Sequence, residues 1–511
     1  MSPRPNSWIV AGAAAVLVPL AATGAAATPT DTGTGPSTET APYVLPLAAG
    51  VDITSLLTVA DGGSASNGYE MVGIPDGLGA FARNNGKVAT FMNHELPATS
   101  GIVRKHGQTG AFVSRLVLKP NSNEIVRGAD LIDPGVQYWD YLQGSYEDMP
   151  NLAGVQADGD VFPAYLAAFG RFCSGDLTAP GQLYNPTSGR GYDGQVYFAN
   201  EEVGDEGRAF GVTTRGKAYQ LPRLGLFSWE NTLAAYNQTD TTMVMGNEDA
   251  STGQMWVYSG TKTFFGQPMA RAGLTNGADF VIDLLDEAVD SDAAYRAAYG
   301  KGSPQPFDLS EVDWDQSGAD QNAEALVEGL TLNRIEDGEF DPNNPNDYYF
   351  LTTAGSPQGT RDGGGLWLAS FTDIEQPELG GTLTLLLDGT ESINLASPDN
   401  MTIDQHGNLL IQEDPGGSDI LARIVAYRIA DGATGAVAEF DPALFAPGGS
   451  GFLTNNEESS GIVDTEDLLG PGSFLFDAQV HVAPPENPLE YVERGQFLRL
   501  QVSDWSAIYG S

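Results

Sequence analysis

The sequence contains one cysteine and few basic residues. Cys173 is the single thiol in 511 residues, so an internal disulfide is excluded and stability has to come from a large hydrophobic core. Lysine and arginine together number 24 against 67 aspartates and glutamates, which gives a formal net charge of −43 at pH 7. Nucleic acid and anionic lipid would be repelled by such a chain. Neither is therefore an expected partner, whereas cations are.

Long apolar runs are also missing after the N-terminus. Residues 1–27 carry one charge, Arg4, followed by the run IVAGAAAVLVPLAA and by three alanines. This pattern predicts a secretory signal peptide over 1–27, a flexible leader over 28–42 and a single domain over 43–511. No later stretch approaches the roughly 18 apolar residues of a membrane-spanning helix. We therefore expect a secreted or periplasmic protein without a membrane span, exported by a signal that lacks a pair of adjacent arginines.

Histidine is scarce as well. The four histidines are His94, His106, His406 and His481. A zinc site built from several imidazoles is therefore not expected, and neither a serine-nucleophile elbow nor a phosphate-cradling glycine loop is evident. The many carboxylates instead favour hard cations such as calcium or oxidised iron.

Short strand-like runs recur along the whole chain, for example KVATFMNHE, GQVYFANEE, DYYFLTT and SFLFDAQVH. Most are bounded by Gly, Asn, Asp or Pro, as hairpin turns require. Helical periodicity is confined to short segments such as NAEALVEG. The pattern predicts an all-β fold with short helical insertions. So many short strands favour a β-propeller, with a pair of β-sandwich domains as the second choice.

Polar and acidic clusters lie at the ends of these strands. They occupy residues 93–95, 200–202, 229–231, 246–249, 333–337, 397–400, 412–415 and 455–461. In a propeller, strand ends converge on the central channel, so clusters far apart in the sequence can meet in one site. Any one of them taken alone also fits an exposed turn.

Arg334 and Glu336 stand at the head of one such cluster. In an extended segment, residues two apart point to the same face, so these side chains are expected to lie together. Two interpretations follow. Either they form an ion pair, or the arginine holds a phosphate beside a metal that the glutamate binds.

A second candidate cation site has the spacing of a calcium-binding loop. Its possible ligands fall at positions 1, 3, 5 and 12 of such a loop, and Gly318 stands at position 6. They are Asp313, Asp315, Ser317 and Glu324. The alternative is a polar loop that leads into a short helix.

The motifs taken in order resemble one known family. In order and spacing, the following motifs resemble those of the PhoX-type alkaline phosphatase family: PDGLGAF, FMNHEL, FCSGDL, FANEEVGDEGR, LGLFSWEN, MGNED with QMWVYSG, NRIEDG, SPDNMTID, GNLLIQEDPG and EESSG. The resemblance extends from about Tyr69 to His481. It implies a six-bladed propeller in which calcium and iron ions, with one cysteine thiolate ligand, hydrolyse phosphate monoesters.

The resemblance also assigns roles to individual residues. It implies that Cys173 binds iron, that Glu202 and Glu230 bind metal, and that Arg334 holds the phosphate while Glu336 binds metal. The other matching positions would be calcium ligands or their neighbours: Asp249, Asp399, Asn400, Glu413, Asp414 and Glu457. The chain departs from the family in having Trp229 before Glu230, where many members have histidine, and in a longer interval between Cys173 and the cluster at 200–202.

The expected protein is thus a monomeric phosphatase with Ca²⁺ and Fe³⁺ as cofactors and small phosphorylated substrates. One alternative is phytase-like or phosphodiesterase activity in the same channel. Another is a non-catalytic propeller that calcium stabilises and that binds an extracellular partner. For Cys173 the alternative role is packing in the core, since a lone cysteine is often buried for that reason alone.

Overall fold

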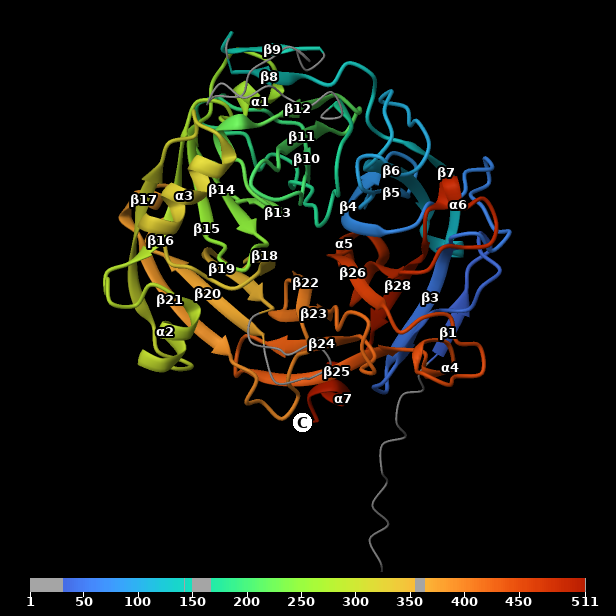
Figure 1. Cartoon of the computed structure of the whole chain (residues 1–511). Helices are drawn as coiled ribbons and strands as arrows, with labels where there is room; N and C mark the ends of the chain where they lie inside the picture. Colours follow the sequence, from blue (N-terminus) through green and yellow to red (C-terminus); the bar gives the residue numbers. More distant parts are fainter. Residues whose placement is uncertain (1–30, 142, 149–166, 354–363, 511) are drawn as a thin grey trace, which may run out of the picture.

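The computed structural model describes residues 31–141, 143–148, 167–353 and 364–510 (Figure 1). The predicted signal peptide and residues 28–30 lie outside the described residues. Strands form most of the regular structure, and the sheets are arranged around a common centre. Helices are few and short, as the sequence predicts.

Two of the sheets are antiparallel meanders whose strands follow one another in the sequence. The first contains β4 (Pro75–Arg83), β5 (Lys87–His94), β6 (Phe112–Lys119) and β7 (Glu124–Asp130). The second contains β10 (Val196–Asn200), β11 (Ala209–Thr213) and β12 (Ala218–Gln220). A hairpin of β8 (Tyr138–Asp140) and β9 (Ser145–Glu147) lies between them in the sequence.

The nine-stranded sheet joins two further meanders. Its first part runs through β13 (Trp229–Ala234), β14 (Thr241–Glu248), β15 (Met255–Thr261), β16 (Ala278–Leu284) and β17 (Gln305–Val312). Its second part contains β18 (Ile335–Asp341), β19 (Asn344–Thr352), β20 (Gly365–Phe371) and β21 (Gly381–Leu387). The two parts are joined because β17 pairs with β21 at their outer side.

The last two sheets each take strands from the N-terminal region. One contains β22 (Pro398–Ile403), β23 (Asn408–Glu413), β24 (Arg423–Arg428), β25 (Ala433–Phe440) and β2 (Val44–Pro46). The other contains β26 (Glu457–Asp464), β27 (Ser473–Val480), β28 (Arg494–Val502), β3 (Val51–Thr58) and β1 (Asp31–Thr34). Because β3 pairs antiparallel with β28, the two ends of the chain share one sheet and the ring of sheets closes. This is a propeller-like fold rather than a pair of β-sandwiches.

The prediction of a flexible leader is wrong for residues 31–42. β1 pairs in parallel register with β3, and Ser37 and Thr38 are buried. The backbone N–H groups of Glu39 and Thr40 donate to Asp61 Oδ2 at 2.8 and 3.1 Å. The segment is poor in apolar residues, but distant parts of the chain satisfy its backbone and thereby order it.

The hydrophobic core is divided among the spaces between neighbouring sheets. In one of these spaces, Leu410 and Ile424 from the β22–β25 sheet pack with Phe474 and Leu498 from the β26–β28 sheet. The strands nearest the centre are β4, β10, β13, β18, β22 and β26 (Figure 1). Polar residues at the ends of these strands are thereby directed toward one region.

The helices occupy connections between strands. They are α1 (Pro268–Arg271), α2 (Asp292–Ala298), α3 (Gly318–Glu328), α4 (Pro442–Phe445), α5 (Glu466–Leu469), α6 (Pro488–Tyr491) and α7 (Trp505–Tyr509). Ser317 caps the N-terminus of α3, where its hydroxyl accepts a hydrogen bond from the Asp320 N–H at 3.2 Å.

Candidate metal centre

Four of the inner strands carry an acidic residue at the same position. Asp76, Glu230, Glu336 and Asp399 are the second residues of β4, β13, β18 and β22. At each of them the register with the next strand is interrupted. Such a bulge redirects side chains locally and is common beside functional sites. The repeated geometry turns one carboxylate from each strand toward the centre of the ring.

These carboxylates join further possible ligands in a continuous array. In the described part of the chain, four groups of three residues bring ligand atoms within 4.8 Å of one another: Asp76–Glu95–Cys173, Cys173–Glu202–Glu230, Glu230–Glu336–Asp399 and Asp399–Asp414–Glu458. Neighbouring groups share Cys173, Glu230 or Asp399. We call the nine residues the acidic array.

Six of the predicted metal ligands belong to the acidic array. They are Cys173, Glu202, Glu230, Glu336, Asp399 and Asp414. Two others border it. Asp249 accepts two hydrogen bonds from Arg334 at 2.8 Å, and Asn400 Nδ2 donates to Ser174 Oγ at 2.5 Å and to Asp76 Oδ1 at 3.5 Å.

The structure places Glu413 away from the acidic array. Its buried carboxylate accepts two hydrogen bonds from the Arg423 guanidinium. Nη2 donates to Oε1 at 2.8 Å, and Nε donates to Oε2 at 3.1 Å. The Ala396 N–H also donates to Oε1 at 2.9 Å. Both oxygens are therefore engaged, and Glu413 stabilises the β23–β24 connection instead of facing the array.

Glu457 is not a member of the acidic array. It is the first residue of β26, and its Oε1 accepts a hydrogen bond from the Ala422 N–H at 3.3 Å, whereas its buried Oε2 has no hydrogen-bond partner in the described residues. Successive strand residues point to opposite faces, so the next residue, Glu458, joins the acidic array in its place.

Three members of the array are not among the predicted ligands: Asp76, Glu95 and Glu458. Each lies inside one of the motifs that resemble the family, namely PDGLGAF, FMNHEL and EESSG. Glu95 directly follows β5, and Asp76 is the second residue of β4. The usable signal was that every cluster places an acid at a strand end.

Arg334 lies at the rim of the array in a left-handed conformation with φ 56°. It precedes β18 rather than belonging to it, so strand alternation does not explain its contact with Glu336. Its Nε and Nη2 donate to the two oxygens of Asp249, and Nη2 also lies 3.2 Å from Glu336 Oε1. Its side chain is 44% exposed. Arg334 and Glu336 therefore do pair, and Asp249 completes the contact.

A second arginine, absent from the sequence prediction, occupies a comparable position. Arg171 has φ 31°, and its side chain is 46% exposed. Its Nη2 lies 2.5 Å from Glu95 Oε1 and 2.5 Å from Glu202 Oε2. Two partly exposed guanidinium groups thus flank the acidic array.

Burial and mutual repulsion disfavour the charged forms of the carboxylates. Burial raises the pKa of Asp76, Glu230, Glu336 and Asp399 well above the usual range, and neighbouring carboxylates raise it further. Burial, with the charge of Glu95, raises the pKa of Glu202 to about 8. Burial and the charge of Asp76 raise the pKa of the Cys173 thiol. A bound cation would offset both effects and favour the ionised ligands.

Unpaired polar atoms beside the array also fit a cation. Asn400 Oδ1 and Gln479 Oε1 are buried and have no hydrogen-bond partner in the described residues. Asn400 Nδ2 and Gln479 Nε2 each donate a hydrogen bond to Asp76. The amide oxygen of each residue is therefore an unpaired acceptor near the array. Carboxylate and amide oxygens with one thiol form a donor set that suits hard cations and a metal that accepts sulfur.

His481 supports one end of the array. Its Nδ1 lies 2.7 Å from Glu493 Oε2 and its Nε2 lies 3.3 Å from Glu458 Oε2. Burial would lower the pKa of His481, but hydrogen bonds to Glu458 and Glu493 raise it to about 11. His94 is a buried structural histidine whose ring nitrogens bond the carbonyl of Gly73 and the hydroxyl of Ser114.

The predicted calcium loop at 313–324 has the alternative structure. Ser317 caps α3, the Asp313 N–H donates to Glu324 Oε2 at 3.2 Å, and the segment before the loop is strand β17. No group of converging ligands forms there among the described residues.

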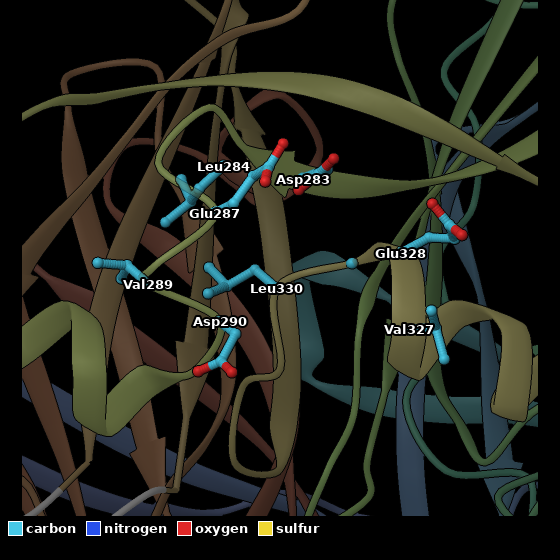
Figure 2. Close-up of a pocket in the computed structure, with 9 residues that line it drawn as sticks. Asp283, Leu284, Glu287, Val289, Asp290, Val327, Glu328 and Leu330 are labelled. Carbon is cyan, nitrogen blue, oxygen red and sulfur yellow. The ribbon is translucent and has the colours of Figure 1, made fainter.

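A separate acidic cavity of about 250 Å³ lies beside the outer part of the nine-stranded sheet (Figure 2). It is lined by Asp283, Glu287, Asp290 and Glu328 together with Leu284, Val289, Val327, Gly329 and Leu330. None of these residues belongs to the acidic array. Burial and the charges of Glu328 and Glu287 raise the pKa of Asp283.

Comparison with solved structures identifies a protein of the same fold. PhoX of Pseudomonas fluorescens, solved in complex with vanadate, a transition state analogue, aligns with 93% of this chain and 98% of its own at a TM-score of 0.60 and 12% identity. The two share a fold. An α-L-arabinofuranosidase of Fusarium graminearum aligns with 84% of this chain and 94% of its own at 8% identity, but its TM-score of 0.39 is too low to bear on the fold.

Sequence comparison does not add to this result. No protein-family model matches the chain, and no curated protein sequence matches it. The likeness to PhoX is therefore a likeness of fold. Among the described residues, no helix has the length and apolar character needed to cross a membrane.

Proposed function

We propose that this protein is a secreted, metal-dependent phosphatase that hydrolyses phosphate monoesters at the acidic array. The observation that carries the proposal is the array itself, in which eight carboxylates and one thiol converge where the inner strands of a PhoX-like fold meet. Structural carboxylates are normally paired with cations, as Glu413 and Glu201 are here. Four carboxylates of the array have no ion pair with a basic side chain among the described residues and lie among other acidic ligands: Asp76, Glu230, Asp399 and Asp414.

The propeller is proposed to have six blades. The β4–β7 and β10–β12 sheets provide two, and the two meanders of the nine-stranded sheet provide two more. The remaining sheets, each completed by N-terminal strands, provide the last two. Inner strands β4, β10, β13, β18, β22 and β26 would then line the channel.

Iron and calcium are the proposed cofactors, because the groups differ in donor chemistry. The two groups that contain Cys173 offer a thiolate beside carboxylates, which suits iron. The groups around Asp399 offer oxygen alone, which suits calcium. When bound, such ions would polarise a phosphoryl oxygen and lower the pKa of an attacking water.

Arg334 is proposed to bind the phosphoryl group. Its Nη1 has no partner in the described part of the chain, while Nε and Nη2 are held by Asp249 and Glu336. Two carboxylates therefore fix the guanidinium, and within the described part of the chain they leave Nη1 available to a ligand. A fixed positive charge at this place would stabilise negative charge that develops on phosphoryl oxygens in the transition state.

Hydrolysis of p-nitrophenyl phosphate and bis(p-nitrophenyl) phosphate by purified protein tests the proposal. We expect hydrolysis of the monoester, little hydrolysis of the diester, and loss of activity after EDTA treatment that added calcium and iron restore. Preference for the diester would support phosphodiesterase activity, and preference for phytate would support phytase-like activity. Activity that survives complete chelation would contradict a metal centre. Metal binding without hydrolysis would leave the non-catalytic, calcium-stabilised propeller.

A further inference from the structure

Arg171 is held by its backbone in a conformation that few non-glycine residues adopt. Its N–H donates to the Leu96 carbonyl at 3.0 Å, and its own carbonyl accepts from the Glu202 N–H at 3.0 Å. Both bonds fix the residue at φ 31°, in the left-handed region. Strained backbone of this kind persists where the surroundings impose it, and it is found most often at functional sites.

Arg171 and Arg334 share three structural features. Each has a positive φ, each side chain is a little less than half exposed, and each guanidinium contacts two carboxylates. Arg171 contacts Glu202 and Arg334 contacts Glu336, and these two carboxylates belong to ligand groups that share Glu230. The rim therefore presents two cationic groups in a chain that has few.

The contacts of Arg171 leave most of its donors available. Both carboxylates are contacted through Nη2, and neither Nε nor Nη1 has a partner among the described residues. Structural arginines of this protein differ. Arg208 forms a bidentate ion pair with Glu201 through Nε and Nη2, and only 2% of its side chain is exposed. Arg423 forms the same kind of pair with Glu413, and 13% of its side chain is exposed.

We propose that Arg171 is a specificity-determining residue that binds a second anionic group of the substrate. The preferred substrate would then be a small phosphate monoester that carries another phosphate or a carboxylate near the phosphoryl group that is cleaved. This inference rests on the proposed function. Arg334 contacts the scissile phosphoryl group, and Arg171, which is held beside the neighbouring ligand group through Glu202, contacts the second anion through Nε and Nη1.

A matched pair of substrates tests this inference. Glycerol 3-phosphate and 3-phosphoglycerate differ by a carboxylate, so the ratio of their kcat/KM values reports the second anion. We expect the protein to prefer 3-phosphoglycerate, and Arg171→Gln to lower that ratio by about 10- to 100-fold, the range for one hydrogen-bonded charge pair. Any loss of metal would affect both substrates and cancel in the ratio. Arg171→Lys should restore part of the preference.

Two controls distinguish the possible failures. Arg334→Ala should lower hydrolysis of both substrates and leave the ratio within about 3-fold, because that residue binds the group the substrates share. Calorimetric titration with phosphonoacetate and methylphosphonate measures the same discrimination without turnover. An unchanged ratio in Arg171→Gln, or no preference in the unmodified protein, would overturn the role of Arg171. Absence of hydrolysis would instead refute the proposed function, and the titration would then decide the role of Arg171 by itself.

Discussion

Replacement of Arg334 by alanine is expected to lower turnover by about 10² to 10³, the usual scale for removing one group that stabilises transition-state charge. The protein should keep its metals and its melting temperature, because Arg334 is partly exposed and is not a ligand. Inhibition by inorganic phosphate should weaken, because the product loses the same contact. Steady-state kinetics, metal analysis and thermal unfolding of the purified variant provide these values.

Glu336→Gln is the matched comparison, because it removes the negative partner of the Arg334–Glu336 ion pair whereas Arg334→Ala removes the positive one. Glu336 is buried and belongs to the Glu230–Glu336–Asp399 group. This variant should lose metal and activity together, and excess calcium or iron should restore part of both. If the two residues served only to pair with each other, both variants would be destabilised alike and the double variant little more. Normal phosphate inhibition of Arg334→Ala would show that this arginine does not contact the phosphoryl group.

Cys173→Ser is expected to give a folded protein that has lost iron and most of its turnover, because a hydroxyl is a poor replacement for a thiolate ligand. Cys173 belongs to two groups of the array, and its Sγ donates to Asp76 Oδ2 at 3.5 Å. Its loss should therefore disturb both groups. The measurements are iron content and turnover relative to the unmodified protein.

A packing role for Cys173 predicts a different outcome. The residue is buried, so a core position would lose about 1 kcal/mol of unfolding free energy on substitution and would leave activity unchanged. Cys173→Ala is the control for the serine hydroxyl, because it removes the sulfur without adding a polar group. Full activity of both variants would return Cys173 to the hydrophobic core.

The sequence predicted which strand ends meet, but not which side chain at each end faces the centre. The cluster at 455–461 contributes one ligand to the array, but it holds two consecutive glutamates on opposite faces of β26. Only the three-dimensional contacts distinguish them, because Glu457 bonds the Ala422 N–H whereas Glu458 lies with Asp399 and Asp414. Similarly, QEDP holds Glu413 and Asp414, and Arg423 on the next strand engages the first.

Backbone irregularities were the other feature that the sequence could not provide. Pairing of Arg334 with Glu336 was anticipated from strand alternation, but the left-handed conformation of Arg334 produces it. The bulges that turn Asp76 and Asp399 inward depend on pairing with β5 and β23. Likewise, residues 31–42 have the composition of a flexible leader, and only their pairing with β3 and Asp61 orders them.

The metal content of the purified protein shows whether the acidic array is a metal centre. We expect elemental analysis to find both calcium and iron bound in stoichiometric amounts. Asp399→Asn, which alters a residue shared by two groups of oxygen ligands, should lose calcium, whereas the same change at Asp283 in the outer cavity should lose none. Purified protein that contains no bound metal, and takes up none when calcium and iron are supplied, would contradict the proposal that the acidic array is a metal centre.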